Sequence, residues 1–162
     1  MIELIFNSFG DPEKNISINN VSSIKRFKNN EILIEILYFP INPADLLLLQ
    51  GKYALTPSLP SKIGAECIAR VKKVGSKIRK IKVNDIVIPL TRNNWTEEKA
   101  VKEEEVIKIN KNINLLQGSM LKINPASAYL MLNNYIKVNE NNYIIQNASN
   151  SSLGRYVIQL CK

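Results

Sequence analysis

Residues 143–154 read YIIQNASNSSLG, and this stretch decides the fold that the sequence predicts. Residues 143–146 have the composition of a short buried strand, residues 147–154 are small and polar like a turn, and residues 155–161 have the apolar spacing of a helix. Such a turn places free backbone N–H groups and the positive end of a helix dipole where a pyrophosphate can bind. We therefore expect the first strand, turn and helix of a nucleotide-binding unit, whose later strands do not follow within the 162 residues.

The composition is that of a globular protein. Hydrophobic residues make up 45% of the chain and charged residues 22%, and no apolar run approaches the length of a membrane span. The two cysteines, Cys67 and Cys161, lie in apolar patterns, which favours reduced thiols. Residues 1–6 lead directly into a strand pattern, with neither a cleavable leader nor an Arg- and Ser-rich presequence. We therefore expect a cytoplasmic protein without a membrane partner.

Short strands separated by turn signals fill residues 1–90. Residues 31–38 alternate, with the even-numbered apolar residues and Tyr38 on one face. Residues 65–72 alternate as well, with the odd-numbered residues on one face and Glu66 among those on the other. Regular short strands of this kind favour a compact β-barrel-like domain.

The pattern becomes helical from Leu115 onwards. Residues 121–132 are expected to form a helix that is broken at Asn124-Pro125. Because the composition changes near residues 110–114, we predict two domains, residues 1–112 and residues 113–162.

One local constellation specifies a short helix. Asn42 is expected to be its N-cap, Pro43 its first residue, and Asp45 an acid in its first turn. Gly51 provides a left-handed stop. Tyr53 follows two residues later and is held by a capped helix, although its position alone does not distinguish a functional side chain from a packed one.

The absence of histidine narrows the chemistry. It excludes a Ser-His-Asp triad, a Cys-His pair and a His-ligated metal within this chain. Cys67 and Cys161 are too far apart in sequence for a CxxC site. Glu66 and Asp45 could pair as acid and base, but nothing in the sequence brings them together. We expect no bound metal and an organic cofactor.

The net charge of +8 raises the question of an anionic partner. A solvated hairpin edge is the favoured interpretation, and attraction to a phosphorylated carrier or an acidic carrier protein is the alternative. No nucleic-acid partner is expected, because no aromatic residues interleave with the basic ones. The basic residues that crowd together are Lys72, Lys73, Lys77, Arg79, Lys80 and Lys82.

Six collinear groups of residues together resemble one enzyme family. The chain resembles the N-terminal half of a medium-chain dehydrogenase/reductase of the zinc-free branch, and most closely the mitochondrial-type trans-2-enoyl thioester reductases, which act on enoyl-CoA or enoyl-acyl-carrier-protein. Zinc-dependent relatives carry a histidine where this chain has Ala65. The matching segments are INPAD with QGKY (residues 41–45 and 50–53), GAE (64–66), VGS (74–76), DIVIP (85–89), NPASAY (124–129) and QNASNS with Gly154 (146–151 and 154).

The resemblance implies an α/β protein with a GroES-like β-barrel catalytic domain, followed by the first strand, turn and helix of an incomplete Rossmann domain. It implies that NADPH delivers a hydride to the β-carbon of a 2-enoyl thioester in fatty acid synthesis, while the α-carbon takes up a proton. The family's active-site tyrosine corresponds to Tyr53, whose phenol is protonated at neutral pH and can donate to an enolate. The implied cofactor-binding residues are Asn42, Ser127, Asn147, Ser149, Asn150, Ser151 and Gly154.

The resemblance also implies partners and leaves alternatives. The expected substrate is a 2-enoyl-CoA or its acyl-carrier-protein counterpart, and the complete enzyme is expected to be a homodimer. Ser152 stands where these reductases usually have glycine, and the arginine that usually follows the tryptophan is replaced by Thr96. A zinc-free quinone or enone reductase remains an alternative, as does a non-catalytic GroES-like fragment.

Overall fold

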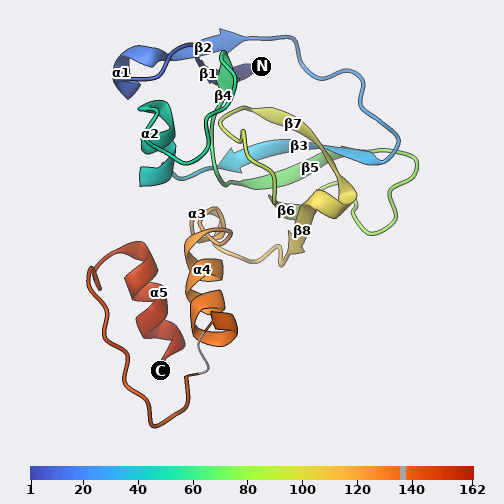
Figure 1. Cartoon of the computed structure of the whole chain (residues 1–162). Coiled ribbons are helices and arrows are strands. Elements are labelled where there is room, and N and C mark those ends of the chain that lie inside the picture. The colour runs from blue at the N-terminus through green and yellow to red at the C-terminus, as the bar shows by residue number, and fades with distance from the viewer. Residues whose placement is uncertain (136–137) are drawn as a thin grey trace. The chain divides into compact units, whose positions relative to one another are not determined.

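The computed structural model describes residues 1–135 and 138–162 (Figure 1). Contacts divide the chain into two compact units, Met1–Ser119 and Met120–Lys162. The first unit is rich in strands and the second contains helices without a strand among its described residues, so the chain is of mixed α/β class. The first compact unit ends at Ser119, seven residues after the predicted end of the first domain at residue 112. The domain boundary between residues 112 and 113 stays a prediction.

The first unit consists of two antiparallel sheets and short helices (Figure 1). One sheet has the strand order β2-β1-β4 and the other has the order β7-β3-β5-β6-β8. A 3₁₀ turn at Glu103–Glu105 joins β7 to β8. The strands are β1 (Ile2–Phe6), β2 (Ile16–Asn20), β3 (Glu31–Tyr38), β4 (Ser61–Lys62), β5 (Ile68–Val74), β6 (Ile86–Pro89), β7 (Glu98–Lys102) and β8 (Val106–Ile109). The helices are α1 (Pro12–Asn15), α2 (Pro43–Leu49) and α3 (Leu115–Gly118).

Two apolar clusters hold this unit together. One lies on the larger sheet and includes Ile32 and Ile34 of β3, so the predicted strand at residues 31–38 is confirmed. Tyr38 is 44% exposed and does not belong to that cluster. The second cluster packs α2 against the smaller sheet, and it consists of Phe6, Leu48, Leu49, Ile63 and Trp95.

The alternation predicted for residues 65–72 is wrong at its beginning. β5 begins only at Ile68, and Glu66 and Ile68 are fully buried together with their apolar neighbours. Residues 65–69 are all buried, so both faces of this segment are covered. A register shift between β3 and β5 at Ile36 and Tyr38 also interrupts the regular pleat there. The exposed face begins at Arg70.

The second unit contains two helices that pack on each other, α4 (Asn124–Leu130) and α5 (Ser152–Leu160). A single π-helical turn, Met131–Tyr135, continues α4. The predicted helix over residues 121–132 is interrupted at Asn124-Pro125 as expected, but residues 121–123 form no helix. α4 begins at Asn124 because Pro125 fits the first turn, where its missing N–H leaves no hydrogen bond unmade.

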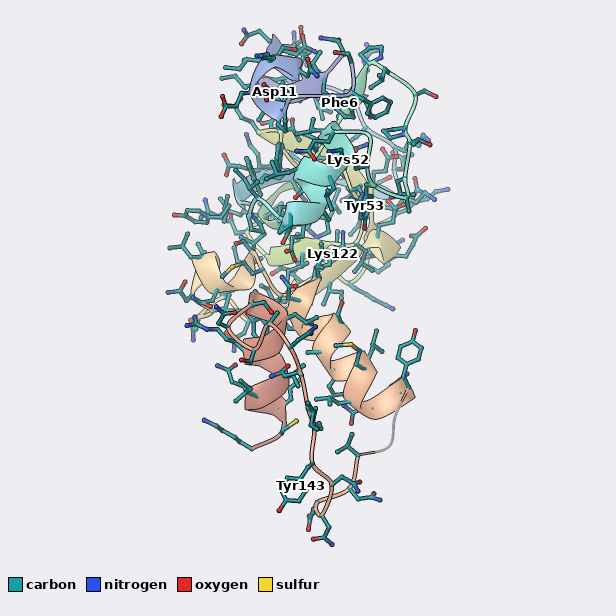
Figure 2. All side chains as sticks on the ribbon, turned by 60° about the vertical axis from the view of Figure 1, so that its left-hand side comes forward. Phe6, Asp11, Lys52, Tyr53, Lys122 and Tyr143 are labelled. Carbon is teal, nitrogen blue, oxygen red and sulfur yellow. The ribbon has the colours of Figure 1, made fainter. Side chains whose placement is uncertain are left out.

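The predicted strand at residues 143–146 does not form. These residues pair with no other strand in the described parts of the chain, and Tyr143 and Ile145 are almost fully exposed. Figure 2 shows Tyr143 at the far end of the loop between α4 and α5. An extended segment becomes a strand only through a neighbour that takes its backbone hydrogen bonds, and the described residues provide none.

The chain shows no membrane-spanning element among the described residues, since none of their helices is long and apolar enough to cross a bilayer.

Candidate functional site

Tyr53 is placed by the end of α2. Gly51 adopts a left-handed conformation with φ of 71°, and the N–H of Lys52 donates to the carbonyl of Leu47 at 2.9 Å, so the predicted stop is confirmed. The half-buried Tyr53 ring packs against the cluster that contains Leu48 and Leu49. Figure 2 shows Tyr53 next to Lys52, just beyond the end of α2. The tyrosine is therefore fixed to the core through a structured helix end.

At the start of α2, Asn42 donates hydrogen bonds to two buried carboxyl groups, those of Asp45 and Glu66. The Asn42 backbone N–H donates to Asp45 Oδ2 at 3.0 Å, and Asn42 Nδ2 donates to Glu66 Oε1 at 3.0 Å. Asp45 and Glu66 are fully buried. Asn42 is at the predicted N-cap position, but its side-chain amide is directed to Glu66. The sequence did not predict that Asp45 and Glu66 share a neighbour.

The carboxyl of Asp45 is poorly solvated. Burial raises the pKa of Asp45 above its ordinary value, and the N–H of Asn42 and the positive charge of Arg92 act against that rise. Arg92 is thus close enough to influence the base of α2, although the two side chains form no ion pair within 4 Å among the described residues.

Arg92 is the residue that the sequence analysis missed. Its guanidinium carbon lies over the ring of Tyr53, 5.8 Å from the ring centroid. No local signal marks it, because it belongs to the loop between β6 and β7, almost forty residues after Tyr53. The position of this charge follows from how that loop folds back onto α2.

The predicted pyrophosphate turn forms a capped helix start within the second unit. Ala148 has a positive φ of 49°, and Ser151 Oγ accepts the N–H of Gly154 at 3.1 Å. A Cβ at Gly154 would lie 2.8 Å from the Ala148 carbonyl oxygen, so only glycine allows the loop to approach α5 this closely. α5 begins earlier than predicted because Ser151 caps it.

The other predicted cofactor residues of the second unit occupy exposed or half-exposed positions, whereas Asn42 of the first unit is buried and its amide donates to Glu66. Ser127 is half-buried on α4, and Asn147, Ser149 and Asn150 are exposed in the loop before α5. Exposed polar groups beside free N–H groups of a helix start are available to a phosphate. The residues present therefore fit a pyrophosphate.

We expect the purified protein to contain no stoichiometric zinc. In the part of the chain that the structure describes, no group of three His, Cys, Asp or Glu residues is placed to hold a metal ion, and a zinc site needs three or four such ligands. Elemental analysis before and after dialysis against a chelator measures this. About one zinc per chain that survives dialysis would contradict the assignment to the zinc-free branch.

Comparison with known proteins gives a consistent result. The family described as alcohol dehydrogenase GroES-like domain matches residues 28–144. An enoyl-[acyl-carrier-protein] reductase of Dictyostelium discoideum, named as mitochondrial, is 38% identical over 158 residues, covering 96% of this chain and 45% of that protein.

Two solved structures are similar in fold. The mitochondrial 2-enoyl thioester reductase Etr1p/Etr2p heterodimer from Candida tropicalis has a TM-score of 0.88 and 26% identity, covering 98% of this chain and 50% of that one. A complex of Etr1p with NADP and crotonyl-CoA has a TM-score of 0.86 and 25% identity, with the same coverage of 98% and 50%. The chain thus spans about half the length of the proteins it matches.

The prediction of a cytoplasmic protein is wrong. The curated relatives are named as mitochondrial proteins, which contradicts it. Reduced cysteines do not distinguish the cytosol from the mitochondrial matrix, and the first residues of this chain carry no information on the compartment.

Proposed function

This chain belongs to the alcohol dehydrogenase GroES-like domain family, and from that premise we propose that it is the N-terminal part of an NADPH-dependent reductase of 2-enoyl thioesters. The observation that carries the proposal is Tyr53, a phenol fixed beside the capped helix α2 with the Arg92 cation over its ring. The similarity of the chain's fold to that of a reductase complex that contains NADP and crotonyl-CoA supports the same chemistry. The mitochondrial location of the named relatives extends to this chain as part of the proposal.

The proposed reaction saturates the 2,3-double bond. Bound NADPH would supply a hydride for the β-carbon, and the α-carbon would then take up a proton. The Tyr53 hydroxyl is the proposed donor for the enolate, since a positioned phenol O–H can transfer its proton to a base that forms nearby. The core contacts of Tyr53 hold it in one orientation, which reduces the entropy lost in reaching the reactive geometry.

The turn at residues 147–154 would hold the pyrophosphate of the cofactor. Its glycine allows the loop to lie close to α5, and the first turn of that helix offers N–H groups and a favourable dipole. The family resemblance also assigns Ser127 of α4 and Asn42 at the start of α2 to the cofactor, and the proposal keeps both assignments. We also propose that the domain boundary lies between residues 112 and 113 and that the complete protein is a homodimer.

The test uses the protein encoded by the complete reading frame that contains residues 1–162. We expect it to oxidise NADPH when crotonyl-CoA is added, followed by the loss of NADPH absorbance. Faster reaction with a quinone than with the thioester would favour a quinone or enone reductase instead. A reading frame that stops at codon 162, without a second part encoded elsewhere, would contradict the proposal.

We expect the same protein to bind NADPH more tightly than NADH. The additional 2′-phosphate of NADPH can accept charge-assisted hydrogen bonds, which lower Kd by roughly tenfold to a hundredfold. Titration of the two reduced cofactors, followed by protein fluorescence or calorimetry, measures the ratio. Tighter binding of NADH would contradict this choice of cofactor.

A further inference from the structure

We propose that Arg92 is a positioning residue for Tyr53: it holds the phenol ring and stabilises the negative charge that the phenolic oxygen acquires when its proton leaves. This inference rests on the proposed function, because it assigns Arg92 a part in the step that Tyr53 performs. It is carried by the position of Arg92 over the Tyr53 ring, by the hydrogen bonds that hold its loop, and by the lack of an ion pair for its guanidinium among the described residues.

The guanidinium of Arg92 lies over the ring of Tyr53. Its central carbon lies 5.8 Å from the centroid of the Tyr53 ring, within the range in which a cation is attracted to an aromatic face. Arg92 is half-buried, so water screens its charge less than at a free surface. The charge therefore acts on Tyr53 at short range.

No other residue in the described parts of the chain takes the donors of this guanidinium. It forms no ion pair within 4 Å and no hydrogen bond with a described side chain or carbonyl. Asp45 experiences its positive charge, but the two groups are not in contact. An arginine used only to neutralise a buried carboxylate usually does so through direct, often bidentate, hydrogen bonds. The observed geometry therefore favours Tyr53, and not Asp45, as the group on which the Arg92 charge acts.

The loop that carries Arg92 is held by hydrogen bonds from Lys99 and Asn94. Lys99 Nζ donates to Thr91 Oγ1 at 2.8 Å, to Asn94 Oδ1 at 3.2 Å and to the carbonyl of Arg92 itself. Asn94 is fully buried, and its Nδ2 donates to the carbonyl of Thr91 at 2.9 Å and to that of Gly64 at 3.3 Å. The backbone of Arg92 is thus anchored to the segment that also contains Glu66, which makes its place beside α2 a property of the fold.

The chemical consequence concerns the moment of proton transfer. When the Tyr53 hydroxyl gives its proton to the α-carbon of the enolate, the O–H bond breaks, a C–H bond forms and the negative charge moves to the phenolic oxygen. A cation already in place beside the ring lowers the energy of that charge separation without any rearrangement. Arg92 itself neither gains nor loses a proton in this step.

The experiment is a double-mutant cycle in the complete protein with crotonyl-CoA. The four proteins are the parent, Arg92→Met, Tyr53→Phe and the double variant, because methionine keeps part of the bulk and removes the charge. We expect Arg92→Met to lower kcat roughly tenfold in the parent, with KM nearly unchanged. In the Tyr53→Phe background the same substitution should change kcat less than about twofold, because the group through which Arg92 acts is gone.

Two further variants separate charge from packing. Arg92→Lys retains a cation and should recover most of the lost kcat. Arg26→Met removes an exposed arginine of the loop between β2 and β3 and should leave kcat unchanged. Thermal unfolding of every variant shows whether the fold is kept.

The outcomes are distinct. An active parent with an equal loss of kcat in both backgrounds, or with no loss in Arg92→Met, overturns the role of Arg92 and leaves the proposed function intact. A parent that neither binds nor reduces the thioester overturns both. A loss that depends on Tyr53 and is recovered by lysine supports the inference.

Discussion

Tyr53→Phe is expected to lower turnover of a 2-enoyl-CoA by roughly 10²–10⁴-fold, the usual contribution of a positioned acid. The substitution keeps the ring that packs against the cluster of Leu48 and Leu49 and removes only the hydroxyl. Because little buried surface is lost, the Kd for NADPH and the thermal stability should stay close to those of the parent. The measurement is steady-state kinetics in the complete protein.

Tyr38→Phe is the matched control. Tyr38 belongs to the same unit, lies at the end of β3 and is 44% exposed, so loss of its hydroxyl should not change turnover. Near-normal turnover in Tyr53→Phe would remove Tyr53 from the mechanism. The family resemblance would then explain the fold of the chain but not its chemistry.

The helix that places Tyr53 could be predicted because its signals are local. Asn42, Pro43 and Gly51 each determine the backbone within one or two residues of themselves, and α2 begins and ends where they indicate. The resemblance to enoyl thioester reductases and the GroES-like fold that it implied are confirmed by the comparisons. They rested on several collinear motifs, not on any single residue.

The environment of Tyr53 could not be predicted, because it is built by contacts between distant segments. The hydrogen bond from Asn42 to Glu66 spans 24 positions, and Arg92 reaches the tyrosine from the loop before β7. Alternation placed Glu66 on the face opposite Ala65 and Cys67, whereas the structure buries it before β5 begins. An acidic residue inside an apolar run was the available signal, since a buried carboxylate requires a partner.

The failed strand at residues 143–146 shows a different limit. Its apolar composition is that of a buried strand, but a segment of this composition forms a strand only when neighbouring strands pair with it. In this chain the segment pairs with no other strand among the described residues, and Tyr143 and Ile145 remain exposed. The turn and helix that follow form nevertheless, because Ser151 and Gly154 specify them locally.

Gly64→Ala is expected to destabilise the chain by about 3–5 kcal/mol, through backbone strain and a clash together. Gly64 has φ of 111°, a conformation that residues with a Cβ rarely adopt. The added Cβ would lie 2.7 Å from the backbone nitrogen of Trp95 and 2.9 Å from that of Asn94. These nitrogens donate to the Ile63 and Gly64 carbonyls at 3.0 and 3.2 Å, so they cannot move without breaking the contact between the two loops.

Gly118→Ala is the matched control, and it determines whether the effect comes from the backbone at Gly64. Both glycines are buried, but the one close contact of a Cβ at Gly118 would be the terminal Cδ1 of Ile68 at 2.5 Å, with Ile113 at ordinary contact distance, and alanine favours the helical conformation of α3. We expect Gly118→Ala to cost about 1 kcal/mol or less, and Gly64→Ala to lower Tm by roughly 10–20 °C. Thermal and urea unfolding of residues 1–162, with Trp95 fluorescence as the probe, compare the two. Equal stability of the two variants would show that the Gly64 loop does not approach Trp95 as described, and Arg92 would then lose the anchor that holds it beside Tyr53.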